Sequence, residues 1–305
     1  MIKIFIFLIL FYWSQSEFNE KPFDPTMFNY CDFSCVEGPK KYNNSACNCV
    51  IKKNHTELLD EVVRFRRDIL KQHNDLRDYL ASGQEAHKHW PEAANMEALN
   101  YDLELEYVAR CYAGYFMVGR DKCRRTKNFF YSGQNIAGKN AKLNVNSTVA
   151  LVRGWYEEIN NVDADEEIKT KFINEFPYHY LKPAGQFTQL IWAKEKYVGC
   201  ARVWNPSNPR ASWRFTLICN YGGSFEGANA KGKPIYQIGE KCSGCPGGMK
   251  CNNDYGGPYT ALCGRINPIP VMAPNEIPKS IGIYLSCHKQ AFLSCVLIVW
   301  LLIYF

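Results

Sequence analysis

Residues 183–192 read PAGQFTQLIW, and this stretch indicates local structure while raising a question about chemistry. Positions 187–192 are rich in aromatic and β-branched side chains, which favours a short strand. Gln186 places a carboxamide where a reactive enzyme more often carries an imidazole. We therefore ask whether Gln186 is an ordinary strand-end residue or marks a site that has lost its chemistry.

Two more runs of strand-forming residues follow this stretch. Residues 197–204 and 214–221 are rich in β-branched and aromatic side chains, and the turn-forming sequence NPSNP lies between them. They predict an antiparallel hairpin. Cys200 on one strand and Cys219 on the other are well placed to form a structural disulfide across it.

Amphipathic helices are predicted upstream of the strands. Apolar residues recur at helical spacing over 56–82, and Gly83 follows where a left-handed cap ends a helix. A second helix is predicted over 97–118 and a third over 145–159. With 305 residues and 47% apolar content, the chain has ample material for a packed core.

Both ends of the chain carry patterns typical of targeting signals. Residues 1–16 combine Lys3, a short apolar run and a small-x-small sequence, as in a cleaved secretory signal peptide; a membrane-spanning helix needs a longer run. The uncharged tail 291–305 extends only ~22 Å as a helix, less than the ~30 Å hydrocarbon layer. With small residues at Ser280 and Gly282, it predicts a glycolipid (GPI) anchor attached at Ser280, and an uncleaved transmembrane tail is the alternative.

Secretion changes how the cysteines are interpreted, because thiols oxidise outside the cytosol. Twelve cysteines precede the C-terminal tail, an even number that suggests six disulfides. A zinc site is the alternative for the C-x-x-C spacing of Cys242 and Cys245. Three glycosylation sequons, at Asn43, Asn54 and Asn146, agree with export.

Composition divides the chain into segments of different character. Residues 229–265 have too few large apolar side chains to form a core and are expected to be held by disulfides, whereas 266–280 contains four prolines and no glycine, which suggests a stiff stalk. The predicted segments are a signal peptide (1–16), a cysteine-rich N-terminal extension (17–55), the main domain (56–228), a cysteine-rich C-terminal extension (229–265), the stalk (266–280) and a hydrophobic C-terminal signal (281–305).

The net charge of +6 is small for this length and is spread along the chain, so nucleic acid is not an expected partner. One local cluster, formed by Lys122, Arg124, Arg125 and Lys127 around Cys123, has the charge to meet an anionic surface. A solvated loop is the other interpretation of this cluster.

Five local sequences carry a family resemblance. They are HNDLR (73–77), SGQNIA (132–137), GWYEEI (154–159), GQFTQLIW (185–192) and LICNY (217–221). In order and spacing they resemble the signature segments of the CAP superfamily, which comprises cysteine-rich secretory proteins, venom antigen five and plant pathogenesis-related proteins of class one. The N-terminal NYC sequence and the late cysteines are most similar to the arthropod antigen-five branch. The resemblance implies an α+β fold, a three-layer α-β-α sandwich with a large cleft, followed here by a small disulfide-rich extension.

In many members of that superfamily the cleft holds a divalent metal through two histidines and two glutamates. The resemblance places Arg120 and Gln186 at the histidine positions, and Gln134 and Glu158 at the glutamate positions. An arginine cannot lose its proton and an amide is a poor zinc ligand, so we expect a degenerate cleft tetrad and no metal or other cofactor. We expect Arg120 to pair with Glu158, with both glutamines completing the hydrogen bonds; the alternative leaves Arg120 in solvent.

The resemblance also implies a set of disulfides. It pairs Cys31 with Cys47, Cys35 with Cys123, Cys49 with Cys111, and Cys200 with Cys219. The pairing among Cys242, Cys245, Cys251 and Cys263 stays open.

The histidines do not form an obvious catalytic site. His73 lies one helical turn from Arg77, where a structural hydrogen bond is favoured over catalysis. His87 and His89 have the spacing to hold copper or nickel weakly, but exposure is favoured, and His179 is expected to pack. The sequence also contains no Gly-x-Ser-x-Gly, His-Glu-x-x-His or phosphate-binding loop.

We therefore predict a non-enzymatic protein, either secreted or anchored to the outer face of the plasma membrane. It would act as a binding module for a protein partner or for a lipid or other amphiphile. One alternative is a metal-dependent extracellular hydrolase or redox protein, which the replaced histidines oppose. The other is a structural surface or adhesion protein.

Overall fold

The computed structural model describes residues 23–85, 89–115, 119–163, 165–176, 183–206 and 213–279. The predicted signal peptide, Ser280, the hydrophobic tail, His87 and His179 lie outside these residues. Within these ranges, none of the helices combines the length and apolar character needed to cross a bilayer.

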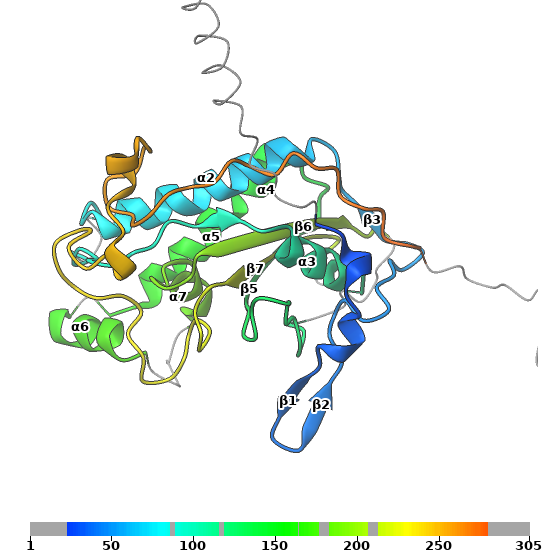
Figure 1. The fold of residues 1–305 in the computed structure, drawn as a ribbon, viewed down its shortest axis with the longest axis horizontal. Coiled ribbons are helices and arrows are strands. Elements are labelled where there is room, and N and C mark those ends of the chain that lie inside the picture. The colour runs from blue at the N-terminus through cyan, green and yellow to red at the C-terminus, as the bar shows by residue number, and fades with distance from the viewer. Residues whose placement is uncertain are drawn as a thin grey trace, which may run out of the picture.

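A five-stranded sheet forms the middle layer of the domain (Figure 1). Strands β6 (Tyr197–Trp204) and β7 (Phe215–Gly222) pair antiparallel with Cys200 opposite Cys219, which confirms the predicted hairpin. Strand β5 (Gly133–Lys139) pairs with the other side of β7. On the side of β6, β3 (Thr56–Glu57) pairs antiparallel and β4 (Asn100–Tyr101) pairs parallel.

Helices cover both faces of this sheet. Helices α2 (Val62–Ala81), α5 (Leu151–Tyr156) and α7 (Gly185–Leu190) share a core with the strand residues Phe215, Leu217 and Tyr221. Helix α3 (Leu103–Tyr115) covers the opposite face, where Ile218 packs with Ala109 and Ala113. Successive strand side chains point to opposite faces, so a strand buried on both sides alternates between two cores. The three-layer sandwich is thereby confirmed.

A glycine on β6 sets how closely α3 approaches the sheet. A Cβ added at Gly199 would lie 2.2 Å from the backbone nitrogen of Glu106 and 2.4 Å from the carbonyl oxygen of Asp102. Both are backbone atoms, one in the first turns of α3 and one in the residue just before it, and they cannot move aside as a flexible side chain would. Any larger residue at position 199 would therefore push α3 off the sheet.

The helices differ in detail from their predicted ranges. Residues 56 and 57 join the sheet as β3, so the first helix is shorter than expected, and Gly83 ends it with a φ of +70°. The predicted helix over 145–159 is divided into α4 (Val145–Val149), α5 and a 3-10 turn, η3 (Glu157–Asn161). Helix α6 (Glu166–Asn174) was not predicted.

The strand predicted over 187–192 is wrong, because residues 187–190 belong to helix α7 and the helix ends at Leu190. The helix buries Phe187 and Leu190, which are three residues apart and so lie on one helical face. A carboxylate from η3 accepts hydrogen bonds from the first N–H groups of this helix. This tertiary contact overrides the local preference of the residues for strand.

The N-terminal extension is held to the domain by disulfides. It contains the turns η1 (Pro25–Met27) and η2 (Tyr30–Asp32) and a projecting hairpin of β1 (Cys35–Glu37) and β2 (Lys40–Tyr42) (Figure 1). Cys35–Cys123 and Cys49–Cys111 join the extension to the domain, whereas Cys31–Cys47 closes a loop within the extension. Together with Cys200–Cys219, they are the four pairs that the resemblance implies.

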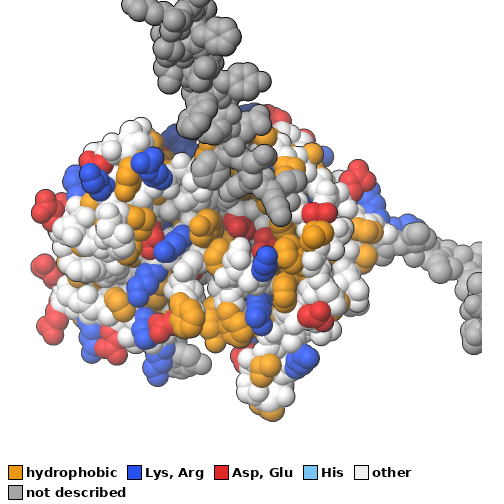
Figure 2. Space-filling model, viewed as in Figure 1, with side chains coloured by type: hydrophobic (Ala, Val, Ile, Leu, Met, Phe, Trp, Pro, Cys, Tyr) orange, Lys and Arg blue, Asp and Glu red, His pale blue; other side chains and the backbone are white. Residues whose placement is uncertain are grey.

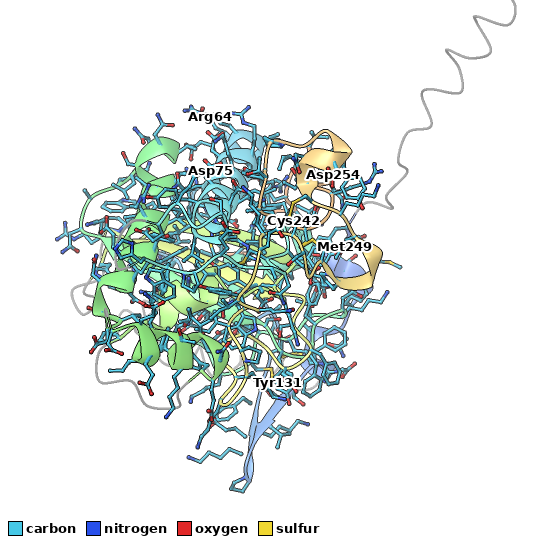
Figure 3. All side chains as sticks on the ribbon, turned by 90° about the vertical axis from the view of Figure 1, so that its left-hand side faces the viewer. Arg64, Asp75, Tyr131, Cys242, Met249 and Asp254 are labelled. Carbon is cyan, nitrogen blue, oxygen red and sulfur yellow. A yellow bond between two sulfur atoms is a disulfide. The ribbon has the colours of Figure 1, made fainter. Side chains whose placement is uncertain are left out.

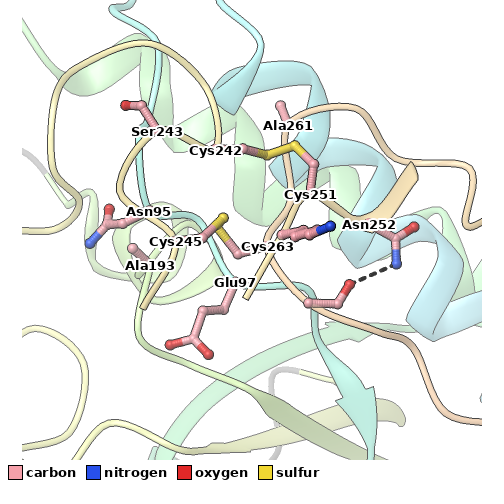
Figure 4. Close-up of a disulfide and its surroundings, with 12 residues drawn as sticks. Asn95, Glu97, Ala193, Cys242, Ser243, Cys245, Cys251, Asn252, Ala261 and Cys263 are labelled. Carbon is pink, nitrogen blue, oxygen red and sulfur yellow. Dashed lines mark hydrogen bonds between the residues drawn. A yellow bond between two sulfur atoms is a disulfide. The ribbon is translucent and has the colours of Figure 1, made fainter. Parts of the chain in front are cut away.

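The C-terminal extension contains two more disulfides, Cys242–Cys251 and Cys245–Cys263, which lie beside each other in Figure 4. Its only regular elements among the described residues are the short turns η4 (Pro246–Gly248) and η5 (Asn252–Tyr255). The labelled residues Cys242, Met249 and Asp254 lie near the upper right of Figure 3, far from Tyr131.

Residues 266–279, which we call the strap, have an irregular course along the domain (Figure 1). Arg66 of α2 donates hydrogen bonds to the carbonyls of Pro270 and Met272 at 2.9 and 2.7 Å. Farther along, the backbone nitrogen of Ile51 donates to the carbonyl of Pro278 at 2.8 Å. The proline-rich segment that was expected to form a stalk is therefore bound along the domain as far as it is described.

Candidate functional site

Glu158 lies on η3 and caps the first turn of α7. Its Oε2 accepts hydrogen bonds from the backbone nitrogens of Gln186 (2.8 Å) and Phe187 (3.2 Å), and its Oε1 accepts one from the Gln186 side-chain amide at 3.2 Å. A carboxylate at a helix N-terminus satisfies backbone donors that have no partner within the helix. Both oxygens of this half-buried carboxylate are thus engaged by the protein itself.

Gln186 connects α7 to the edge strand β5. Its side-chain oxygen accepts a hydrogen bond from the backbone nitrogen of Ile136 at 3.2 Å. Its backbone carbonyl accepts one from the side chain of Asn135 at 2.9 Å. Gln186 is therefore not a strand-end residue, and its side chain has a structural role. The amide nitrogen donates to Glu158 and the amide oxygen accepts from β5, so that both polar atoms hold α7 in place.

Gln134, on β5, and Arg120 form a second pair at this site. The side-chain nitrogen of Gln134 donates to Asn220 at 3.1 Å, whereas its buried Oε1 has no hydrogen-bond partner in the described part of the chain. The guanidinium of Arg120 donates to the backbone carbonyl of Gln134. Arg120 as a residue is exposed, but partial loss of water around its guanidinium lowers its pKa, the charge of Arg124 lowers it further, and the charge of Glu158 acts in the opposite direction.

The expected direct ion pair between Arg120 and Glu158 does not form among the described residues. Arg120 instead donates to a main-chain carbonyl, and the oxygens of Glu158 are taken by the N–H groups of α7. The structure therefore brings Glu158 and Gln186 into contact and joins Arg120 to Gln134. The two pairs are coupled by charge across the site, without a salt bridge.

These four side chains do not fit a divalent transition metal. Zinc prefers thiolate, neutral imidazole or carboxylate ligands, and the four offer one carboxylate, two amides and one guanidinium. The single carboxylate already accepts three hydrogen bonds, so a metal would have to displace the cap of α7. The one fixed positive charge would also repel a cation.

His73 belongs to a buried hydrogen-bond chain with a structural role. Its Nδ1 lies 2.7 Å from the carbonyl oxygen of Ile69, which can only accept, so Nδ1 carries the proton. Its Nε2 therefore accepts from the hydroxyl of Tyr221 at 2.9 Å. Burial lowers the pKa of His73 to about 4, which keeps the ring neutral at physiological pH.

Arg77 and Glu195 are two buried charged residues whose proximity the sequence did not predict. Arg77 is fully buried and its guanidinium donates to backbone carbonyls, among them those of Glu97, Leu190 and Trp192. Burial raises the pKa of Glu195 to about 7, and hydrogen bonds from Gln189 and nearby backbone only partly offset the loss of water. Nothing in the local sequence of Glu195 indicates burial, because its partners come from distant segments.

The remaining predicted sites are placed as follows. Among the described residues, the only close group of potential metal ligands is Cys242, Cys245 and Cys263, and each sulfur is in a disulfide and so cannot be a thiolate ligand. The predicted glycan acceptors Asn43, Asn54 and Asn146 are all exposed. His89, the one described member of the loop histidine pair, is exposed as well.

The fold and its disulfides define a cysteine-rich α-β-α sandwich. The profile of the CAP family, described as the cysteine-rich secretory protein family, matches residues 70–221. Venom allergen 5 of Vespula maculifrons is 34% identical over 219 residues, which cover 68% of this chain and 98% of the allergen. Venom allergen 5 of Rhynchium brunneum is 30% identical over 209 residues, which cover 67% of this chain and 83% of the allergen.

The chain belongs to the CAP family and is similar to its antigen-five members. A solved structure, described as NaASP2 with Zn²⁺, superposes with a TM-score of 0.51 at 24% identity. The match covers 65% of this chain and 94% of NaASP2. At that identity the likeness supports the shared fold alone.

Proposed function

We propose that this protein is a non-enzymatic extracellular binding module of the CAP family whose ancestral metal-binding cleft now has a structural role. The proposal rests on the observation that the carboxylate of Glu158 already accepts hydrogen bonds from the protein itself. Its two oxygens cap α7 and hold the Gln186 amide, while Arg120 supplies a fixed positive charge nearby. The module would recognise a protein partner or an amphiphile, and it would reach the cell surface through the predicted signal peptide and C-terminal anchor.

The relative described with Zn²⁺ provides the contrast for this proposal. In our chain the four side chains contain no imidazole, so the donors of a zinc site are missing. A metal-dependent hydrolase or redox protein would need those donors, together with a metal-bound water. Without these donors, we expect the protein to act by binding a partner on its disulfide-bonded surface.

The test compares metal binding by the native protein and by a variant with restored ligands. The native protein, purified after secretion, should contain only substoichiometric zinc or copper by elemental analysis and should give no heat on titration with zinc. The triple variant Arg120→His, Gln134→Glu, Gln186→His should bind zinc if these four positions surround one site. The control variant Arg67→His, Gln237→His adds two imidazoles at exposed positions and should not. Stoichiometric metal in the native protein would refute the proposal.

One observation supports an amphiphile as the ligand. A groove of about 520 Å³ lies between α2 and residues 252–269, and its lining includes Leu70, Tyr255, Tyr259 and Ile266. Arg67, Lys71 and Arg265 also line it, so an apolar chain with an anionic head would match both kinds of side chain. Solvent extraction of the purified protein followed by mass spectrometry should recover a bound lipid if the module is a carrier. Recovery of no lipid would favour a protein partner.

A further inference from the structure

Two segments distant in sequence form one positively charged face. Residues 32–42 and 119–131 are joined by the disulfide Cys35–Cys123. Together they contain seven Lys or Arg residues and three Asp or Glu residues, a net formal charge of +4, whereas the whole chain carries only +6. We call these segments the cationic–aromatic face. In Figure 2, hydrophobic and Lys or Arg side chains are visible at the lower edge of the molecule beside the projecting hairpin, with some Asp or Glu side chains between them.

Most of the cations on this face have no acidic partner. Arg124 pairs with the largely buried Asp121 at 2.6 Å, and Lys122 lies 3.5 Å from the exposed Glu37. In the described part of the chain, the side chains of Lys40, Lys41, Arg125 and Lys127 form no ion pair with a carboxylate. Their charge is therefore available to an external anion.

Aromatic rings are exposed among these cations. Phe130 and Tyr131 are 54% and 53% exposed, and the guanidinium of Arg125 lies 4.3 Å from the centre of the Phe130 ring. Phe225 is 91% exposed on a turn that ends at Gly227. A Cβ at Gly227 would lie 3.3 Å from the Cβ of Tyr131, so this turn adjoins the aromatic pair. Figure 3 places Tyr131 at the lower end of the molecule.

The combination distinguishes between kinds of anionic partner. A soluble polyanion, such as a sulfated glycan, is attracted by the lysines and arginines and gains little from an isolated, protruding phenyl ring. A bilayer offers both an anionic headgroup layer and, directly beneath it, an apolar layer in which rings are favourable. Cations and aromatic side chains on one surface are the composition that suits that boundary.

We propose that the cationic–aromatic face binds the surface of a bilayer that exposes anionic lipid headgroups. The lysines and arginines contact the headgroups, and Phe130 enters the interfacial region together with Phe225 of the adjoining turn. This contact goes beyond the proposed function, since it is a property of surface side chains and does not depend on whether the Glu158 site binds metal. A zinc-containing protein would refute the proposed function and leave the membrane contact standing.

The test measures binding of the mature protein to vesicles of phosphatidylcholine with or without phosphatidylserine. Each cation near an anionic surface is worth about fivefold in binding, so Lys122→Gln, Arg125→Gln, Lys127→Gln should weaken binding to the phosphatidylserine vesicles by ~100-fold. Phe130→Ser, Phe225→Ser should weaken it further at high salt, where charge attraction is screened. The control Lys142→Gln, Lys171→Gln, Lys194→Gln removes three exposed cations outside this face and outside the groove beside α2, and it should bind like the native protein.

Three results would overturn the proposal. The first is equal binding to both kinds of vesicle by all variants, which would assign the contact to the hydrophobic tail. The second is native-like binding by the phenylalanine variant at every salt concentration together with tight binding to heparin, which would identify a sulfated polymer as the partner. The third is an equal loss in the control variant, which would mean that overall charge is responsible. Melting temperatures of all variants should stay within roughly 4 °C of that of the native protein, because the substitutions remove surface contacts, chiefly the stacking of the partly exposed Arg125 on Phe130.

Discussion

Replacing Arg66 with alanine should both destabilise the domain and release the strap. Arg66 is fully buried on α2. Its guanidinium donates two hydrogen bonds to the carboxylate of Glu106, both 2.7 Å long, and two more to the strap carbonyls of Pro270 and Met272. One side chain therefore joins α2, α3 and the strap.

The size of the effect follows from what the substitution leaves behind. Glu106 is 3% exposed, and without Arg66 its remaining side-chain partner is the hydroxyl of Tyr101 at 2.8 Å. Removing one member of a buried ion pair costs about 3–5 kcal/mol, because the other charge stays buried without compensation. For a domain of this size, each kcal/mol lowers the melting temperature by roughly 2–4 °C. We expect Arg66→Ala to melt roughly 6–20 °C below the native protein.

The assay combines thermal unfolding with limited proteolysis of residues 266–279. Arg66→Ala should be cleaved in the strap under conditions in which the native protein is resistant. The neighbouring Arg67→Ala is the matched control, because its side chain is 62% exposed and pairs only with the adjacent Asp68, so its stability should change by no more than ~0.5 kcal/mol. The double variant Arg66→Met, Glu106→Leu should recover most of the loss, because no buried charge remains. Equal melting temperatures for Arg66→Ala and Arg67→Ala would refute this reasoning.

Two further predictions concern a buried acid and the glycines. Burial raises the pKa of Glu195 to about 7 from an ordinary 4.5, so between these values the folded state keeps a proton that the unfolded chain releases. The protonated carboxyl therefore contributes fully to the free energy of unfolding below pH 4.5, and this contribution is lost as the pH rises through 7. Glu195→Gln should therefore match the native protein near pH 4 and exceed it above pH 7 by up to about 3 kcal/mol in urea unfolding; an unchanged difference across the pH range would count against a protonated Glu195. Gly199→Ala should prevent secretion of folded protein, since its methyl group collides with the backbone of α3, whereas Gly154→Ala in α5 meets no atom within 4 Å and should raise the free energy of unfolding by about 0.5–1 kcal/mol. Normal secretion and melting of Gly199→Ala would contradict the close packing of α3 on β6.

The hairpin and the long helix were predictable because their signals are local. Strands β6 and β7 are rich in β-branched and aromatic residues and are buried on both faces, as expected for strands covered by helices on both sides, and the turn sequence between them limits the register. The end of α2 was equally predictable from the sequence, because a residue that tolerates positive φ is needed at position 83 and the sequence has glycine there. In each case the evidence lies within a few residues of the feature.

The strand predicted over 187–192 failed because the deciding contact is not local. The run has the composition of a strand, yet Glu158 from a preceding turn caps the N–H groups that begin α7. The same limit applies to the site. Sequence similarity singled out Arg120, Gln134, Glu158 and Gln186, but it did not indicate that Arg120 would donate to a backbone carbonyl in place of Glu158. Nor could four prolines reveal that Arg66 would hold the strap.

The distribution of arginine shows why the net charge of the chain does not indicate where its surface is charged. Arg66, Arg77, Arg110 and Arg202 are all at least 96% buried and contact carboxylates or backbone carbonyls, so they add to the formal charge while serving the interior. On the cationic–aromatic face, by contrast, Lys40, Lys41 and Lys127 are exposed and form no ion pair within the described part of the chain. At physiological salt their field extends only about 8 Å, so an anionic partner senses it on close approach to this face and not from afar. Binding that depends on this face should therefore lose affinity steeply with added salt, whereas the fold, whose arginines are shielded from solvent, should keep its melting temperature under the same conditions.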